Sequence, residues 1–321
     1  MCSSDLPAEV PVSALKVKGG VTFAGVGGNS RNYWNSQGLT WSPRIGLAYQ
    51  VTEKLVYRGG YGIFYQPNGI LRTNSILNGF TRGTPIVASN DGGLTWASNL
   101  TNPLPGGLFP VLGASEGLQT TLGQGTSAFN PERKMAPSHR FSGGFQYQAP
   151  GGIMIETSYV GNRSYRLPIS RPMSAVPLQY LSKLPYRDTA TINFLSQNFT
   201  SPFFGLHPNF TSRNISRNQL LTPYPHFSSV TVDDAVGYSW YHSMQNRIEK
   251  RFSKGYTLQG SYPWSKAMEA TSFLNAADPM PYESLSVIDR LHRVTGSGIS
   301  ELPFGKARKS GSPMPGVLDF F

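Results

Sequence analysis

The sequence is poor in cysteine, in charged residues and in long apolar runs. Cys2 is the only cysteine among 321 residues, which excludes an internal disulfide and a cysteine-based metal cluster. Only 14% of the residues are charged, against about 25% in typical soluble domains. No apolar run approaches about 18 residues, which excludes a membrane-spanning helix. The short, half-apolar strands of a membrane barrel remain compatible with these absences.

Signals for metal binding and for catalysis are also missing. The five histidines have no metal-ligand spacing and no cysteine partner, so they are interpreted as single surface or lumen residues and no metal or cofactor is predicted: His139, His207, His226, His242 and His292. Asp233 and Asp234 are interpreted as a solvated acidic turn rather than a cation site. An S-x-x-K pattern at Ser13 lacks its companion motifs, and no enzyme activity is predicted.

The net charge of +11 does not identify a partner by itself. Lysine and arginine are dispersed, with no dense run of five or more, so nucleic acid is not an expected partner. The segment Met1–Leu6 lacks the basic start and apolar core of a signal peptide. It resembles adapter-derived sequence, and segment 1–14 is expected to be foreign or disordered.

What the chain does contain is glycine, proline and aromatic residues, with 35 Gly, 25 Pro and 12% aromatics. This is a turn-rich composition that favours β-structure. Residues 43–51 and 55–65 alternate apolar and small or polar side chains around a turn at 52–54, which predicts a β-hairpin. Ile45, Leu47, Tyr57 and Tyr61 fall on its apolar face.

Two more hairpins follow the same pattern. They are predicted at 139–148 with 153–161, and near 238–252 with 256–265. Single strands are predicted at 15–24 and 290–302, and short helices at 176–184 and 187–198. Pro263 removes a ladder donor, so its strand is expected to be broken there or to lie at an edge.

The connections between these strands alternate in length. Tight turns are predicted at 52–54, 149–152, 253–255 and 303–306, and long polar loops at about 66–138, 162–236 and 267–288. Outer-membrane barrels sort their connections in this way, with short periplasmic turns and long external loops. The prediction is therefore an all-β, antiparallel, up-and-down barrel fragment of about eight strands, forming an open curved sheet.

Aromatic spacing gives a second test of this prediction. Tyr57 and Tyr65 stand eight residues apart on the apolar face, as do Tyr256 and Trp264. Eight residues span about 26 Å along a strand. A tilt near 40° reduces this to about 20 Å of height, close to the roughly 25 Å between aromatic girdles.

The alternation assigns side chains to two faces. The predicted lipid-facing or girdle residues are Tyr57, Tyr65, Phe145, Tyr159, Tyr256 and Trp264. The predicted lumen-facing residues are Arg44, Arg58, Arg140, Glu156, Arg247, Glu249 and Arg251. Two interpretations of these lumen charges stay open, namely contact with a plug or substrate path, and hydrated or mutually paired wall charges.

Four ordered blocks resemble the barrel of Oar-like TonB-dependent outer-membrane receptors, a family with a carboxypeptidase-regulatory-like N-terminal domain. The blocks are Pro43–Tyr65, Tyr159–Arg163, Tyr241–Lys266 and Asp289–Lys306. The resemblance implies energised uptake of a bulky, scarce substrate across the outer membrane of a Gram-negative bacterium. It also implies outer-membrane lipid and the TonB complex as partners, the latter through a plug domain.

The chain departs from the family's pattern in several ways. The family's full barrel has 22 strands, and no plug or TonB-contacting segment is recognised here. Residues 15–306 are therefore interpreted as a partial barrel and 307–321 as a truncated end. The alternatives are a passive porin-like or adhesive surface barrel and a soluble all-β carbohydrate-binding module.

Overall fold

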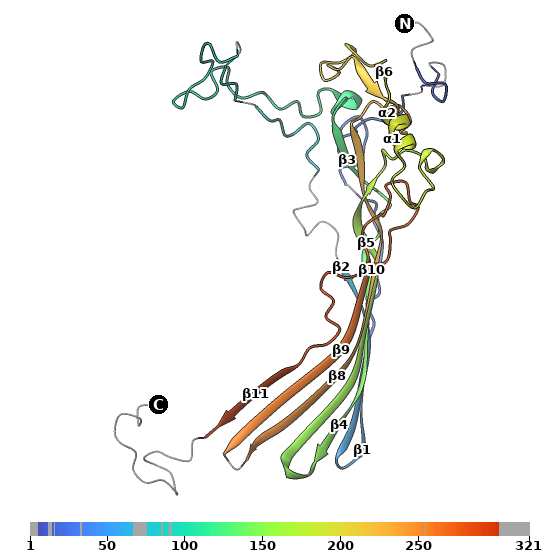
Figure 1. Cartoon of the computed structure of the whole chain (residues 1–321). Helices are drawn as coiled ribbons and strands as arrows, with labels where there is room; N and C mark the ends of the chain where they lie inside the picture. The colour runs from blue at the N-terminus through green and yellow to red at the C-terminus, as the bar shows by residue number, and fades with distance from the viewer. Residues whose placement is uncertain are drawn as a thin grey trace.

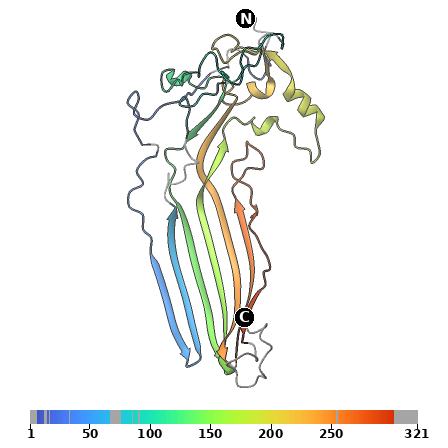
Figure 2. The same ribbon diagram turned by 90° about the vertical axis from the view of Figure 1, so that its left-hand side faces the viewer.

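A single long, twisted and open β-sheet dominates the computed structural model (Figure 1). The structure describes residues 6–11, 15, 17–32, 34–66, 76–84, 86–89, 92–253 and 255–301. Long connections gather at one end of the sheet and tight turns at the other (Figures 1 and 2). The predicted sorting of connections is confirmed for the turns at 52–54 and 149–152. Lys254, in the predicted turn at 253–255, and residues 303–306 lie outside the described residues.

The sheet is built mainly from antiparallel neighbours in chain order. Its long strands are β1 (Arg44–Thr52), β2 (Leu55–Gln66), β4 (Ala136–Ala149), β5 (Ile153–Pro172), β8 (Ser229–Ser253) and β9 (Tyr256–Ala270). Two shorter strands, β10 (Ser284–Leu285) and β11 (Thr295–Ser300), pair with different parts of β9, and β3 (Gly125–Phe129) pairs in parallel with the start of β8. The predicted antiparallel fold class is confirmed, and the sheet does not close within the described residues.

The three hairpins occur where the alternation predicts them, but the strands are longer than expected. β5 and β8 continue past the other strands into the loop end, where Ile169 pairs with Asp234 and Pro172 with Thr231. These extensions follow register shifts after Ser164, so the simple period of two is lost there. The polar composition of these extensions therefore gives no sequence signal for the loop-end parts of β5 and β8.

The strand predicted at 15–24 is wrong, because none of its described residues is in a strand. Gly19 adopts a φ of +84°, which interrupts an extended conformation. A Cβ on Gly20 would lie 2.6 Å from the carbonyl oxygen of Leu118. The segment therefore packs against a loop instead of extending the sheet.

Short elements occupy the long connections. They include α1 (Thr189–Ser196), α2 (Arg217–Leu220) and a small hairpin of β6 (Asn198–Thr200) with β7 (Asn214–Ser216). The helix predicted at 187–198 matches α1, whose first turn is capped by the Asp188 carboxylate. Hydrogen bonds from Thr191 and Ser182 lower the pKa of Asp188. The helix predicted at 176–184 is wrong, since the chain forms only a 3-10 turn and becomes extended at Leu181.

Strand β9 runs through Pro263 without a break. The carbonyl of Pro263 accepts a hydrogen bond from the Arg293 N–H, on the side away from β8. The missing donor therefore faces the gap between the β11 ladder and the isolated Trp264–His292 bridge. The strand is therefore not broken at Pro263, whereas the alternative of an edge-like position fits its nitrogen, which lies on the side of β9 away from β8 and costs the β8–β9 ladder no hydrogen bond.

Buried apolar side chains gather in the loop end rather than under the sheet. Phe203, Leu220, Leu221 and Phe227 are buried there, and His226 is only 2% exposed. Many large apolar side chains on the long strands are instead exposed. Among the described residues, none of the helices has the length and hydropathy needed to cross a membrane.

Candidate functional site on the polar face of the sheet

The register gives the sheet two chemically different faces. One, called the apolar face, carries most of the exposed apolar side chains of the long strands: Ile45, Leu47, Tyr49, Tyr61, Phe145, Ile155, Tyr159, Met244, Ile248, Leu258 and Trp264. The opposite face, called the polar face, carries arginine, glutamate, serine, glutamine and glycine at the alternate positions. Side chains alternate between the faces because the strand period is two.

The structure groups the predicted site residues according to this division. The girdle residues Tyr57, Tyr65, Phe145, Tyr159, Tyr256 and Trp264 all lie on the apolar face by register. Of the predicted lumen charges, Arg44, Arg58, Arg140, Glu156, Arg247 and Glu249 share the polar face. Arg251 lies within the register shift between Lys250 and Ser253, so the pairing does not assign it to a face. That the polar face lines a lumen stays a prediction.

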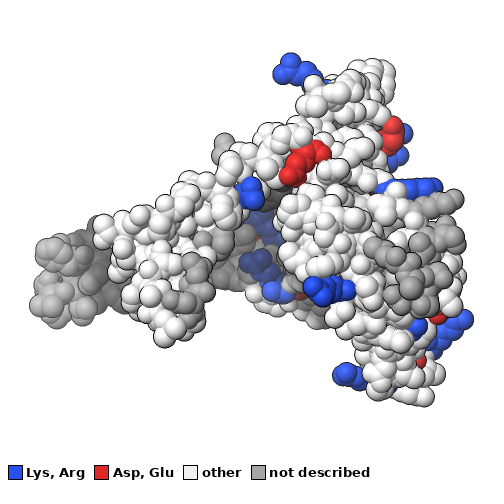
Figure 3. All heavy atoms as spheres, turned by 90° about the horizontal axis from the view of Figure 1, so that it is seen from above, with Lys and Arg blue, Asp and Glu red and all other residues white. Residues whose placement is uncertain are grey.

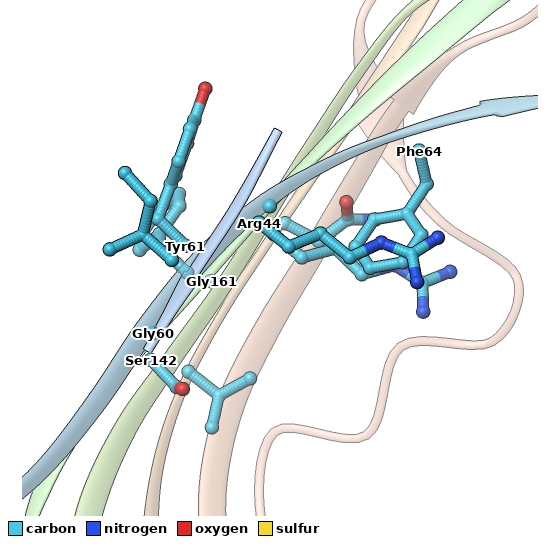
Figure 4. A pocket seen from close by; sticks show the side chains of 12 residues that line it. Arg44, Gly60, Tyr61, Phe64, Ser142 and Gly161 are labelled. Atoms are coloured by element: carbon cyan, nitrogen blue, oxygen red, sulfur yellow. The ribbon is translucent and has the colours of Figure 1, made fainter. Parts of the chain in front are cut away.

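The most distinctive feature of the polar face is a ring held between two cations. The guanidinium carbon of Arg44 lies 4.6 Å from the centroid of the Phe64 ring, and that of Arg140 lies 4.9 Å from it. Figure 4 shows Arg44 and Phe64 on one side of the strands and Tyr61 on the other. We call Arg44, Phe64 and Arg140 the arginine–phenylalanine cluster. Its ring quadrupole attracts both guanidinium groups.

Glycine at position 62 makes room for this cluster. Gly62 stands between Arg44 on β1 and Arg140 on β4 in a single pairing row. A Cβ at this position would lie 3.1 Å from the Phe64 ring and 3.3 Å from the Arg44 side chain. The absence of a side chain therefore lets the ring lie back over the strand between the two arginines.

The cluster carries a local excess of positive charge. Among the residues that the structure describes, neither Arg44 nor Arg140 forms an ion pair. The neighbouring polar groups are uncharged: Arg140 faces Asn162 by register, and Asn162 accepts a hydrogen bond from Ser138 at 2.6 Å. The cluster borders a hollow of about 470 Å³. In the view from the loop end, more basic than acidic side chains are visible, several of them in the central recess (Figure 3).

Closer to the turns, the polar face has a shallow groove with mixed charges. The groove has a volume of about 580 Å³ and is lined by Arg58, Glu156 and Arg247 above a floor that includes Gly144. Arg247 pairs with Glu249 at 2.8 Å. A Cβ on Gly144 would meet the neighbouring strand backbone at 2.6 Å, so the strands approach closely there. Among the described residues, the groove thus contains one ion pair, whereas the arginine–phenylalanine cluster contains none. Both interpretations of the lumen charges stay predictions.

The interpretation of Asp233 and Asp234 as a solvated acidic turn is wrong. Asp233 and Asp234 lie in β8 rather than in a turn; Asp233 pairs with Arg133, and Asp234 lies 3.7 Å from Arg171. Among the described residues, no three His, Cys, Asp or Glu side chains form a possible metal site.

The interpretation of the histidines as single surface or lumen residues is wrong for His226, which is buried. His139, His242 and His292 each hydrogen-bond a tyrosine on the apolar face. Sequence reasoning also gave Phe64 no role. The alternation along β2 could have identified it, because Phe64 falls on the same face as the charged and small residues of that strand.

These features together define the wall of an outer-membrane β-barrel: an antiparallel sheet, one apolar and one polar face, and connections sorted by length. The chain belongs to the family of outer membrane beta barrel domains, which it matches over residues 5–321. Its location is therefore the outer membrane, as predicted from the turns and loops. The alternative of a soluble carbohydrate-binding module is wrong.

Comparison with solved structures gives a match to a double-substituted variant of the ferric enterobactin receptor of Pseudomonas aeruginosa. The match covers 81% of this chain at 10% identity, with a TM-score of 0.30. It spans 32% of that receptor chain. No curated protein matches the chain.

Proposed function

We propose that this chain is part of the barrel of a TonB-dependent outer-membrane transporter of the Oar-like kind. The four ordered sequence blocks support this subfamily, and the membership of the outer membrane beta barrel family supports the location. In this proposal the chain carries out no covalent chemistry. It encloses a path through which a bulky, scarce substrate passes when the TonB complex acts on a plug domain.

The observation that carries the proposal is the uncompensated positive charge of the arginine–phenylalanine cluster. Two guanidinium groups that only bracket an aromatic ring keep most of their donors free for an acceptor. A barrel wall that met only bulk water would have no need to hold two arginines side by side. We infer that carboxylates of a plug or an anionic group of the substrate occupy this position.

The orientation of the two faces is tested by spin labels on matched positions. In the full-length protein with Cys2 replaced by serine, single cysteines at Arg140 and at Phe145 place labels on opposite faces of β4. The label at 145 is expected to collide mainly with oxygen, which dissolves in lipid, and the label at 140 with a water-soluble nickel complex. The reverse pattern would overturn the assignment of lumen and lipid faces.

The transport mechanism is tested separately from the orientation. A plugged, energised transporter shows no steady conductance in planar bilayers, and its uptake stops when the TonB complex is removed. An Arg44→Gln, Arg140→Gln variant is expected to reduce uptake while the barrel still inserts. Steady conductance together with TonB-independent uptake would support the porin-like alternative instead.

A further inference from the structure

The apolar face carries three tyrosine–histidine pairs that share the same hydrogen bond, between the tyrosine hydroxyl and Nδ1 of the histidine. The tyrosine oxygens of Tyr61, Tyr159 and Tyr262 lie 2.7, 2.5 and 2.8 Å from Nδ1 of His139, His242 and His292. In each pair the two side chains come from neighbouring segments of the sheet, β2 with β4, β5 with β8, and β9 with the bridge before β11. We call these six residues the tyrosine–histidine belt.

The belt repeats at regular intervals along the sheet. Each tyrosine stands six positions after the first residue of a strand that leaves a tight turn: 55 to 61, 153 to 159, and 256 to 262. Pairing across the sheet links Tyr61 to Gly161, which is two residues beyond Tyr159. Pairing likewise links Tyr159 to Trp264, two residues beyond Tyr262. The belt therefore shifts by one residue toward the turns for each strand.

This shift places the three pairs at one height in a membrane. A shift of about 3.3 Å per strand, with strands about 4.8 Å apart, corresponds to a tilt of about 35°. Barrels of the outer membrane have tilts of about 35–45°. A line through the three tyrosines is therefore parallel to the membrane plane. A line through the tight turns has the same direction, because each tyrosine lies six positions from the start of its strand.

The height of the belt matches one boundary of the apolar band. On β4, His139 lies eight residues from Tyr147, which is near the turn end of the same face. This separation is about 26 Å along the strand, or about 21 Å of height at that tilt. The apolar band of such barrels is about 25 Å tall. The histidines consequently mark the edge of the band that is nearer to the loops.

Cations lie at this edge, on the same face. Arg163 pairs by register with His139, and Lys266 pairs with His242. Both are exposed, and neither forms an ion pair with a residue that the structure describes. Arg163 lies over the Tyr165 ring at 5.2 Å, and Lys266 lies 6.0 Å from the Trp240 ring. Aromatic rings thus hold both cations against the sheet surface while leaving their donors accessible.

We propose that the belt, with Arg163 and Lys266, binds the phosphorylated headgroups of lipids in the leaflet next to the loops. Two exposed cations, imidazole groups and tyrosine hydroxyls at one membrane height complement phosphate oxygens, which accept several charge-assisted hydrogen bonds. Two acidic groups lie nearby: Glu283 accepts a hydrogen bond from the Trp240 ring N–H at 3.3 Å, and Asp289 accepts one from the backbone N–H of Ala267 at 2.7 Å. The proposal depends on the proposed function only in that the apolar face meets lipid.

The test measures binding of lipid A that carries both phosphates to the full-length protein in phosphatidylcholine nanodiscs. Arg163→Gln and Lys266→Gln are each expected to weaken binding about fivefold, and about 25-fold together. Arg58→Gln, on the polar face, is the matched control and is expected to leave binding unchanged. Unmodified protein is expected to prefer lipid A over its dephosphorylated form, which tests the proposal even if a variant fails to insert.

Several results would overturn the proposal. Equal binding of the phosphorylated and dephosphorylated lipid would show that the phosphate groups are not recognised. Competition by inorganic phosphate as strong as that by lipid A would show a free-anion site instead of a lipid site. If Arg58→Gln weakened binding as much as Arg163→Gln, the polar face would meet lipid and the assumed orientation would be wrong. TonB-dependent uptake is expected to persist in the Arg163→Gln, Lys266→Gln variant, so the two proposals fail separately.

Discussion

The coupling between Phe64 and Arg140 is the most direct test of the arginine–phenylalanine cluster. Phe64→Leu keeps an apolar side chain but removes the ring that lies between the guanidinium groups at 4.6 and 4.9 Å. Each cation–π contact at an exposed site contributes about 0.5–1 kcal/mol. The variant is therefore expected to lose about 1–2 kcal/mol from both contacts, in addition to any loss of packing.

A double-mutant cycle separates these contributions. Phe64→Leu and Arg140→Gln, alone and together, are made in the full-length protein, and the free energy of unfolding is measured by urea titration in lipid vesicles. The coupling energy is expected to be about 0.5–1 kcal/mol, since the single Arg140 contact is what both substitutions remove.

The control uses a ring on the other face of the sheet. Phe145 packs against Tyr57 at 5.2 Å on the apolar face, whereas Arg140 is on the polar face. Phe145→Leu and Arg140→Gln are therefore expected to be additive within about 0.3–0.5 kcal/mol. A Phe64–Arg140 coupling no larger than this control would refute the conclusion that the ring holds the arginine.

Further predictions concern two glycines and a buried histidine. Gly62→Ala is expected to destabilise the barrel by about 1–3 kcal/mol in the same titration through crowding of the cluster, while Gly60→Ala, whose Cβ would meet nothing closer than 3.4 Å, is expected to change it much less. Gly144→Ala is expected to reduce the folded, heat-modifiable band on gels, because its Cβ would meet neighbouring backbone at 2.6 Å. Burial lowers the pKa of His226, so its contribution to stability is complete above about pH 6.5 and decreases as the pH falls below that value. Hydrogen exchange in residues 217–228 is expected to accelerate at mildly acidic pH beyond the intrinsic chemical effect, and not in His226→Gln; equal pH dependence in both proteins would contradict this.

The alternation of residue types along the chain was sufficient to predict the hairpins in the part of the sheet near the tight turns. Alternation in 43–65 fixed both strands of the first hairpin, and the side chains of Arg44 and Tyr61 lie on opposite faces, as the period of two requires (Figure 4). The turn at 52–54 is short, and its polar residues separate two alternating segments, so its place was also predictable. The strand predicted at 15–24 failed because a few alternating residues do not specify whether a partner strand is available.

The loop end was harder to predict, because its structure depends on contacts between distant segments. The continuation of β8 to Ser229 is stabilised by a parallel strand about 100 residues earlier and by the Arg133–Asp233 ion pair. Such contacts leave no local signal in a polar, glycine- and proline-rich segment. The same limit explains why Asp233 and Asp234 were interpreted as a solvated turn.

The sequence by itself determined that this protein has strands with one apolar and one polar face, joined by short turns at one end and long loops at the other. Those features depend on residue type and spacing, which are local. Only the tertiary structure decided which side chains meet across strands, because strand register is set by many pairings at once. Register brings Phe64 between Arg44 and Arg140, and it aligns three tyrosine–histidine pairs at one height.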